Sequence, residues 1–187
     1  MIGTGKKQDF LESPVKLMII LGLGSNLSSS FGDRYKNIET ALSFLINNKI
    51  TINKKSSFYE TPSYPNASDP KFINIVIEIS TDLNPSELAS IIIFIEEKLE
   101  RKRNKKNDPR TCDIDIIDYK QMVLDFIYKD MKFSVPHEKL SLRNFVLFPL
   151  NEIIPTWKHP KTNEHISLLI EKLPNVDKNA ILKINNY

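Results

Sequence analysis

Alternating hydrophobic and polar residues predict β-strands in two stretches of the chain. In residues 72–79 every second residue is isoleucine, so the four isoleucines share one face, which we expect to be buried. The other face carries Phe72 and Asn74, an aromatic ring and an amide that are unusual on a plain solvated surface. Residues 112–119 alternate in the same way, with Asp113 and Asp115 opposite a row of apolar side chains.

Apolar residues at steps of three and four predict helices between the strands. This spacing occurs over residues 35–45 and again over residues 88–99. Asn84 before Pro85, with Glu87 two residues later, is a typical helix start. The remaining expected elements are strands at 17–23 and 50–59, a long loop at 61–70, a hairpin from 122–126 and 131–135, and helices near 142–152 and 166–173.

This order of elements predicts an α+β fold in which an antiparallel sheet has helices on one face. The chain has 187 residues, which suits one domain of the usual size of about 100–200 residues. We expect that domain at residues 17–174, after a polar extension at 1–16 and before a tail at 175–187. The apolar run at 17–23 is too short for a membrane span, which needs about 20 residues.

Composition narrows the class of protein. Hydrophobic residues make up 41% and charged residues 26% of the chain, which is typical of a soluble globular protein. The single cysteine, Cys112, excludes an internal disulfide framework and fits a reducing cytoplasm. The spacing of the glycines excludes the two common nucleotide-binding loops. The third glycine of a dinucleotide-binding motif would fall at Leu27, and the only Gly-Lys pair, which a phosphate-binding loop would need, is at residues 5–6.

The net charge of +3 conceals one strongly basic segment. Residues 101–110 contain six basic residues and one acidic residue, a local charge of +5, so the rest of the chain sums to −2. This segment runs directly into Asp113 and Asp115, whose carboxylates project from one strand face and suit hard divalent cations. Arginines beside metal-binding carboxylates are the groups that phosphoryl transfer needs. On these residues alone, a solvated strand face and a nucleic-acid-binding or merely soluble loop remain alternatives.

Six short motifs occur in one order over about residues 18–157. The most specific is PRTCDIDII at residues 109–117. The others are GSNL at 24–27, SFYETP at 57–62, FIN at 72–74, VPH at 135–137, and RNF at 143–145 followed by PL at 149–150. With these motifs the chain resembles the 6-hydroxymethyl-7,8-dihydropterin pyrophosphokinase family of folate biosynthesis.

The resemblance implies a ferredoxin-like α+β fold, with helices on one face of the antiparallel sheet and the active site on the other. It also implies a 2-amino-4-hydroxy-6-hydroxymethyldihydropteridine diphosphokinase, which transfers pyrophosphate from ATP to the hydroxymethyl group of the pterin and releases AMP. The implied cofactor is Mg²⁺, as two ions, with ATP as co-substrate.

The same resemblance implies a role for individual residues. Asp113 and Asp115 would hold the magnesium ions, while Arg101 and Arg110 would stabilise charge on the transferred group. The implied ATP contacts are Glu96, Arg103, Lys132, His137 and Arg143. The implied pterin contacts are Thr61, Pro62, Tyr64, Phe72, Asn74 and Phe145, with the two phenylalanines as a ring sandwich.

Two other interpretations stand beside this one. A ferredoxin-like RNA-binding module would use the basic segment, but such sheets carry a glycine-aromatic strand motif that residues 72–79 lack. A catalytically inactive homologue is the second, because Asp108 stands where the family pattern has Gly or Ala. We expect ATP and the pterin as ligands of a monomeric, cytoplasmic protein without nucleic-acid or membrane partners.

Overall fold

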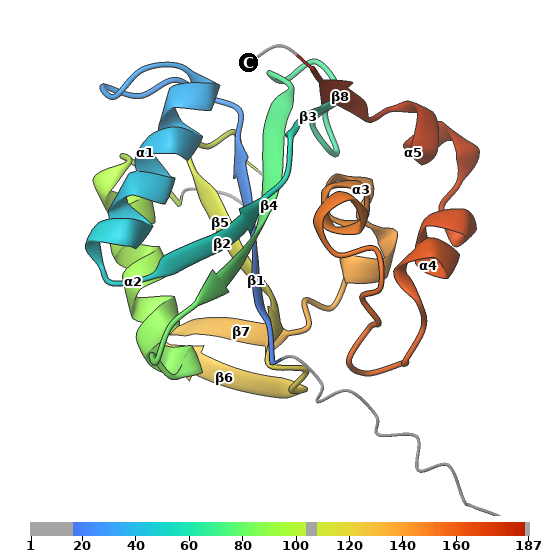
Figure 1. The fold of residues 1–187 in the computed structure, drawn as a ribbon. Helices are drawn as coiled ribbons and strands as arrows, with labels where there is room; N and C mark the ends of the chain where they lie inside the picture. The colour runs from blue at the N-terminus through green and yellow to red at the C-terminus, as the bar shows by residue number, and fades with distance from the viewer. Residues whose placement is uncertain (1–16, 104–107, 186–187) are drawn as a thin grey trace, which may run out of the picture.

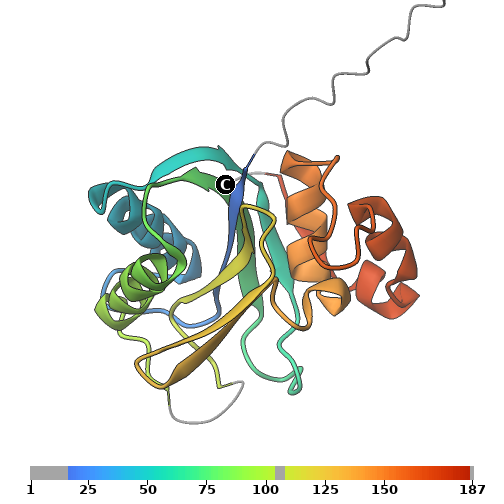
Figure 2. The same ribbon diagram turned by 90° about the horizontal axis from the view of Figure 1, so that it is seen from below.

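The computed structural model describes residues 17–103 and 108–185, and it shows an antiparallel sheet between two sets of helices (Figure 1, Figure 2). Six strands form this sheet in the order β5-β1-β4-β3-β8, with β2 also paired to β4. The predicted α+β class is therefore confirmed. The strands are β1 (Ile19–Ser25), β2 (Thr51–Lys55), β3 (Phe58–Thr61), β4 (Phe72–Ser80), β5 (Asp113–Tyr119) and β8 (Leu182–Ile184).

The two helices on the first face begin at side-chain caps. α1 (Arg34–Asn47) follows Asp33, whose carboxylate accepts a backbone hydrogen bond from the first helical turn at 2.9 Å. α2 (Pro85–Lys98) follows Asn84, which forms a reciprocal capping box with Glu87, as the sequence predicted. A cap of this kind stabilises a helix by about 1 kcal/mol. The capping side chains of Asp33 and Asn84 therefore fix the residues at which the two helices begin.

α1 and α2 pack on the sheet face that carries the isoleucines of β4. These four isoleucines are each at most 2% exposed, which confirms the face that the alternation predicted. Ile38 and Leu45 of α1 and Leu88 and Ile92 of α2 belong to the same buried cluster. Burying an aliphatic side chain contributes about 1.5–3 kcal/mol, so this cluster is a large part of what holds the fold together.

The second face of the sheet also carries helices, so the prediction of helices on one face only is wrong. α3 (Asn144–Ile153) packs on this face and α4 (Ile166–Lys172) packs on α3 (Figure 2). Ile20, Val76 and Ile117 project from three neighbouring strands into this second buried cluster. Exposing these side chains to water would be costly, and the helices are the cover that they need.

A smaller sheet forms the predicted hairpin. β6 (Leu124–Tyr128) pairs with β7 (Met131–Val135) in an antiparallel ribbon of two strands. Phe126 and Phe133 stack across the ribbon with their ring centroids 5.1 Å apart. The hydroxyl of Tyr128 donates a hydrogen bond at 2.8 Å to a serine hydroxyl of α2. The hairpin is thereby held against α2.

Two further boundaries differ from the sequence prediction. Residues 50–59 form two strands, because the Ser56 hydroxyl accepts the Val76 N–H at 3.0 Å where a continuous strand would use a backbone carbonyl. Residues 175–184 form α5 (Asn175–Asn179) and β8, and β8 pairs with β3 and so covers an edge that would otherwise be unpaired. The boundary predicted at residue 174 therefore does not separate a tail from the domain. The extension predicted at 1–16 lies outside the described residues.

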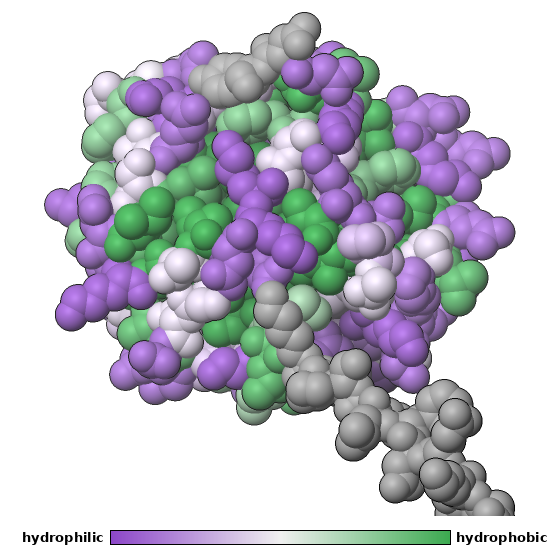
Figure 3. All heavy atoms as spheres, in the orientation of Figure 1, coloured by the Kyte–Doolittle hydropathy of each residue, from purple (hydrophilic) through white to green (hydrophobic). Residues whose placement is uncertain are grey.

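The surface mixes polar and apolar side chains. Figure 3 shows hydrophobic side chains in several areas of one face, with hydrophilic side chains between them. Single exposed apolar residues are normal on protein surfaces, and we assign no function to them. Among the residues that the structure describes, no helix has the length and apolar character that a membrane span requires.

The second buried cluster leads to a stability prediction. Leu150 of α3 is 0% exposed, so Leu150→Ala should lower the free energy of unfolding by about 2–5 kcal/mol. Leu142 is 71% exposed, and the control variant Leu142→Ala should change the free energy of unfolding by no more than about 0.5 kcal/mol. Urea denaturation measures both variants. A small effect of Leu150→Ala, equal to that of the control, would show that α3 contributes no second core.

Candidate active site

Three neighbouring strands place a carboxylate, a glycine and an amide in one row on the second sheet face. The register pairs Gly24 of β1 with Asp113 of β5 on one side and with Asn74 of β4 on the other. Residues paired across antiparallel strands point to the same face. A Cβ on Gly24 would lie 3.1 Å from Asn74 Oδ1 and 3.6 Å from the Phe72 ring. A side chain at residue 24 would therefore crowd Asn74, and the glycine lets Asn74 and Phe72 lie close to the backbone of β1.

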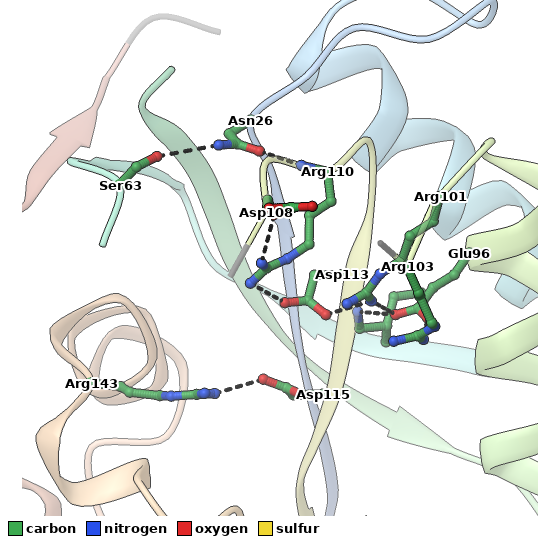
Figure 4. A network of polar contacts seen from close by, with 11 residues as sticks. Asn26, Ser63, Glu96, Arg101, Arg103, Asp108, Arg110, Asp113, Asp115 and Arg143 are labelled. Atoms are coloured by element: carbon green, nitrogen blue, oxygen red, sulfur yellow. Dashed lines mark hydrogen bonds and ion pairs between the residues drawn. The ribbon is translucent and has the colours of Figure 1, made fainter. Parts of the chain in front are cut away.

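Asp113 and Asp115 share one face of β5, as the alternation predicted, and arginines bind both (Figure 4). Arg101 and Arg110 each contact Asp113 at 2.6 Å, and Arg143 contacts Asp115 at 2.7 Å. Burial by itself raises the pKa of Asp113, but Arg110 and Arg101 outweigh it and hold the pKa below its ordinary value. Asp113 is therefore ionised, and its charge is neutralised from within the protein.

Glu96 lies buried beneath Arg101 and Arg103. Its residue is 2% exposed, and one carboxylate oxygen accepts the Ile114 N–H at 2.8 Å and also binds Arg101. The other oxygen binds Arg103. Burial raises the pKa of Glu96 to about 7, although Arg101 acts in the opposite direction. α2 thereby holds both arginines at the start of the basic segment, of which residues 104–107 lie outside the described part of the chain.

A pocket of about 310 Å³ lies between α2, β5 and the hairpin. Lys132 stands in its lining and pairs with Glu138 at 3.0 Å. Burial lowers the pKa of His137, so the ring is neutral at pH 7, and its Nδ1 accepts the Lys139 N–H at 3.0 Å, which leaves Nε2 as the donor. The pocket brings together seven of the residues that the resemblance implied: Glu96, Arg101, Arg103, Asp113, Asp115, Lys132 and His137.

The amide implied for the pterin is fixed by its neighbours. Asn74 is 4% exposed, and its Nδ2 donates to Thr61 Oγ1 at 3.1 Å and more weakly to the Tyr59 carbonyl at 3.4 Å. Pro62 and Tyr64 lie farther along the same loop, and Tyr64 is 82% exposed. The structure thus brings Thr61 and Asn74 together and leaves Pro62 and Tyr64 at the surface.

Each phenylalanine implied for the ring sandwich has an arginine on its ring. The guanidinium of Arg110 lies 5.0 Å from the Phe72 ring centroid, and that of Arg143 lies 5.4 Å from the Phe145 centroid. A contact of this kind is favourable by about 0.5–1 kcal/mol at an exposed site. Because the same two arginines bind the carboxylates of β5, they connect the acidic pair to both rings.

No role for Asn26 follows from the sequence beyond its place in the GSNL motif, yet its side chain joins three segments (Figure 4). Asn26 is 2% exposed, and its Oδ1 accepts the Arg110 backbone N–H at 2.7 Å. Its Nδ2 donates to Ser63 Oγ at 3.2 Å and to the Pro70 carbonyl at 3.0 Å. Asn26 therefore ties the loop at residues 61–70 to the backbone of Arg110.

The single cysteine has no part in this arrangement. Cys112 is 0% exposed and faces the first core together with Ile114, as the alternation predicted. Burial, and next the carboxylate of Glu96, raises the pKa of the Cys112 thiol well above its ordinary value. The thiol is therefore protonated, which excludes a thiolate nucleophile at this position.

The family model for 7,8-dihydro-6-hydroxymethylpterin-pyrophosphokinase (HPPK) matches residues 20–155 of the chain. The chain belongs to this family. The 2-amino-4-hydroxy-6-hydroxymethyldihydropteridine pyrophosphokinase of Aquifex aeolicus is 36% identical over 142 residues, which cover 76% of this chain and 83% of that protein. The pyrophosphokinase of Bacillus subtilis, which has the same name, is 36% identical over 134 residues, which cover 71% of this chain and 75% of that protein.

Longer proteins also match, and the chain spans only a part of them. The folic acid synthesis protein fol1 of Schizosaccharomyces pombe is 33% identical over 164 residues, which cover 87% of this chain and 21% of that protein. The crystal structure of Plasmodium falciparum HPPK-DHPS A437G with pteroate has a TM-score of 0.68 at 17% identity, and the match covers 96% of this chain and 49% of that one. This last likeness shows a shared HPPK fold.

The contacts of Asn26 lead to a prediction about stability. Asn26→Ala should lower the free energy of unfolding by about 1–3 kcal/mol, because the Arg110 N–H loses its side-chain acceptor and the Pro70 carbonyl keeps only the Ser63 hydroxyl as a donor. Asn66→Ala is the matched control, since Asn66 lies exposed in the same loop and binds Asp69 there. We expect a change of no more than about 0.5 kcal/mol for the control in urea denaturation. Equal effects would mean that Asn26 does not hold the three segments together.

Proposed function

We propose that the protein transfers the pyrophosphoryl group of ATP to the hydroxymethyl group of 6-hydroxymethyl-7,8-dihydropterin and releases AMP. The observation that carries this proposal is the row of Asp113, Gly24 and Asn74, in which a carboxylate and an amide flank a residue without a side chain. Membership of the HPPK family and 36% identity to the two bacterial pyrophosphokinases support the same reaction.

The chemistry of Asp113 and Asp115 fits magnesium. Mg²⁺ prefers oxygen ligands and is usually bound by one or two carboxylates, with waters and substrate phosphates as the other ligands. Within the described ranges, no three His, Cys, Asp or Glu side chains gather as a metal cage. Two ions on the two aspartates belong to the proposal. When bound, magnesium supplies neutralisation of the phosphate charge.

The arginines bind phosphate in this proposal by exchanging one anion for another. In the free protein Arg101 and Arg110 are paired with Asp113, and Arg143 with Asp115. A guanidinium binds carboxylate and phosphate oxygens with the same forked geometry, so each arginine could exchange its carboxylate for a phosphate oxygen of ATP. Arg101 and Arg110 would then stabilise the transferred group, and Arg143 would hold ATP.

The remaining residues implied for ATP surround the same pocket. Arg103 and Lys132 add positive charge to its lining, and the Nε2–H of His137 is a neutral donor for a phosphate oxygen. Glu96 acts through Arg101 and Arg103 in this proposal, because both of its carboxylate oxygens are already bonded. The catalytic charge therefore comes from arginines that an acidic side chain of α2 holds in place.

The pterin lies beside Asn74 and Gly24 in this proposal. Asn74 Oδ1 lies near Gly24, and its Nδ2 is fixed by Thr61, so the amide is oriented before a ligand arrives. Phe72 and Phe145 supply ring faces for stacking, which a flat heterocycle prefers in an offset arrangement. Pro62 and Tyr64 belong to the proposal as loop residues beside the ring.

Finer features that the resemblance implied stay predictions. They are the ferredoxin-like topology, the second sheet face as the active-site face, a cytoplasmic location and a monomeric state. The placement of Asp113, Gly24 and Asn74 on the second face supports the choice of that face. No contact among the described residues favours the RNA-binding alternative.

Loss of either carboxylate tests the reaction. Asp113→Asn and Asp115→Asn should each lower pterin-dependent AMP release at least about 100-fold, because the charge that holds the metal is gone. The assay measures AMP from ATP and Mg²⁺ with and without the pterin. Asp125→Asn is the control, since Asp125 is exposed on β6 and accepts a hydrogen bond from the Ser134 hydroxyl of β7. AMP release that needs no pterin, or an active Asp113→Asn protein, would contradict the proposal.

Gly24 tests the place of the pterin. Gly24→Ala should raise the KM for the pterin about tenfold and leave the KM for ATP nearly unchanged, because its methyl group would lie 3.1 Å from Asn74 Oδ1. Gly22→Ala is the matched control on the same strand, where the methyl group would meet Ile117 at 3.3 Å instead. We expect it to affect thermal stability without changing the KM for the pterin. A selective rise in the KM for ATP in Gly24→Ala would place the pterin elsewhere.

A further inference from the structure

Residues beyond the family match hold the helix that begins beside Arg143 and Phe145. The match ends at residue 155, and α4, α5 and β8 all follow it. α3 begins at Asn144, so Arg143 and Phe145 stand at its N-terminal end. In the proposed reaction they supply one of the arginines and one of the rings. Their position depends on where this end of α3 lies.

α3 does not fix its own N-terminus. Its N-cap residue, Arg143, makes no side-chain capping hydrogen bond, and its guanidinium binds Asp115 instead. The helix has ten residues and contains Pro149. Helices of this length are marginal alone and take their position from packing. Contacts from outside the helix therefore set where its first residues lie.

The C-terminal segment, residues 175–184, contacts α3 at both ends. At the N-terminal end, Asn144 Nδ2 donates to the backbone carbonyl of Asp177 in α5 at 2.6 Å. At the other end, Lys183 of β8 pairs with Glu152 at 3.2 Å, and Glu152 accepts the Tyr59 hydroxyl of β3 at 2.9 Å. Figure 1 shows α3 between the sheet and the chain of α4 and α5. The segment thus holds the helix against the sheet.

We propose that the C-terminal segment positions α3 for the reaction, with Asn144 as the positioning residue that fixes Arg143 and Phe145. This inference rests on the proposed function. Asn144 touches no substrate in it and acts through its two neighbours. Without the contact to Asp177 the N-terminus of α3 shifts, which moves the guanidinium away from the phosphates and the ring away from the pterin. A misplacement of about 1 Å is enough to lower a rate about 100-fold.

Asn144→Asp tests this with little change of shape. The new carboxylate keeps an oxygen for the Phe145 N–H, which the asparagine accepts at 2.7 Å, but it has no donor for the Asp177 carbonyl. We expect the KM for the pterin to rise about tenfold and kcat to fall, at temperatures well below the Tm of the variant. Lys183→Met breaks the contact at the other end from an exposed position and should change the same constants in the same direction, but less.

Lys178→Met is the matched control within α5. Lys178 donates to the Glu171 carbonyl of α4 at 3.1 Å, so its loss loosens α5 from α4 and leaves the contacts to α3 in place. We expect the KM for the pterin and kcat to stay within about twofold of the wild type. If Lys178→Met raises the KM as much as Asn144→Asp does, general loosening explains the effect and the positioning role is overturned.

Hydrogen exchange on the same full-length proteins gives a readout that needs no activity. Asn144→Asp should speed the exchange of the α3 amides and leave β1 and β4 unchanged. Faster exchange in α3 with unchanged kinetic constants, or unchanged exchange with a raised KM, would overturn the inference. If the wild-type protein releases no AMP, the proposed function fails, while the exchange of α3 still decides whether α5 fixes the helix.

Discussion

β1 lies between β4 and β5, and its hydrogen-bond register holds the candidate site together. The register places Gly24 between Asn74 and Asp113, so groups far apart in the sequence meet on one sheet face. A slip of one residue would turn a whole strand's side chains to the wrong face. The same strands bury Ile20 and Val76 under α3 at the other end of that face. Such a slip would expose these apolar side chains, so the second core protects the geometry of the site.

The charges of the site are balanced inside the protein. An unpaired buried carboxylate is costly, and here Glu96 and Asp113 are bound by Arg101 while further arginines complete the pairing. This arrangement lets a concentrated set of charges exist in a folded chain without ligand. It also means that a ligand gains only the difference between its own contacts and those it replaces. Affinity for a polyphosphate is therefore set by both sets of contacts.

Features that depend on neighbours in the sequence were predictable, and those that depend on strand order were not. Asn84 and the helix it caps, and the shared face of Asp113 and Asp115, follow from spacings of a few residues. Gly24 belongs to the GSNL motif, and only the pairing of β1 with two other strands shows that it lies between Asn74 and Asp113. The alternation over residues 72–79 puts Val76 on the face opposite the isoleucines, but its cover by α3 comes from a distant segment.

The family resemblance implied site residues that the spacing of residue types alone does not indicate, and the structure changes the role of some of them. Seven residues that the family resemblance implied line one pocket, although they come from several different elements of the fold. Tyr64 remains at the surface, and Glu96 lies under Arg101 and Arg103 and binds both. Asn26 had no implied role because its partners lie on two other segments. The family likeness indicates which residues belong to the site, whereas contacts between distant segments become visible only in the folded structure.

Cys112 gives the protein a built-in site for chemical labelling. It is the single cysteine of the chain, and it lies fully buried next to Asp113. A protonated, buried thiol does not react with an alkylating reagent until the surrounding structure opens. The rate at which such a reagent modifies the native protein therefore measures how often the strand that carries the two aspartates separates from the core.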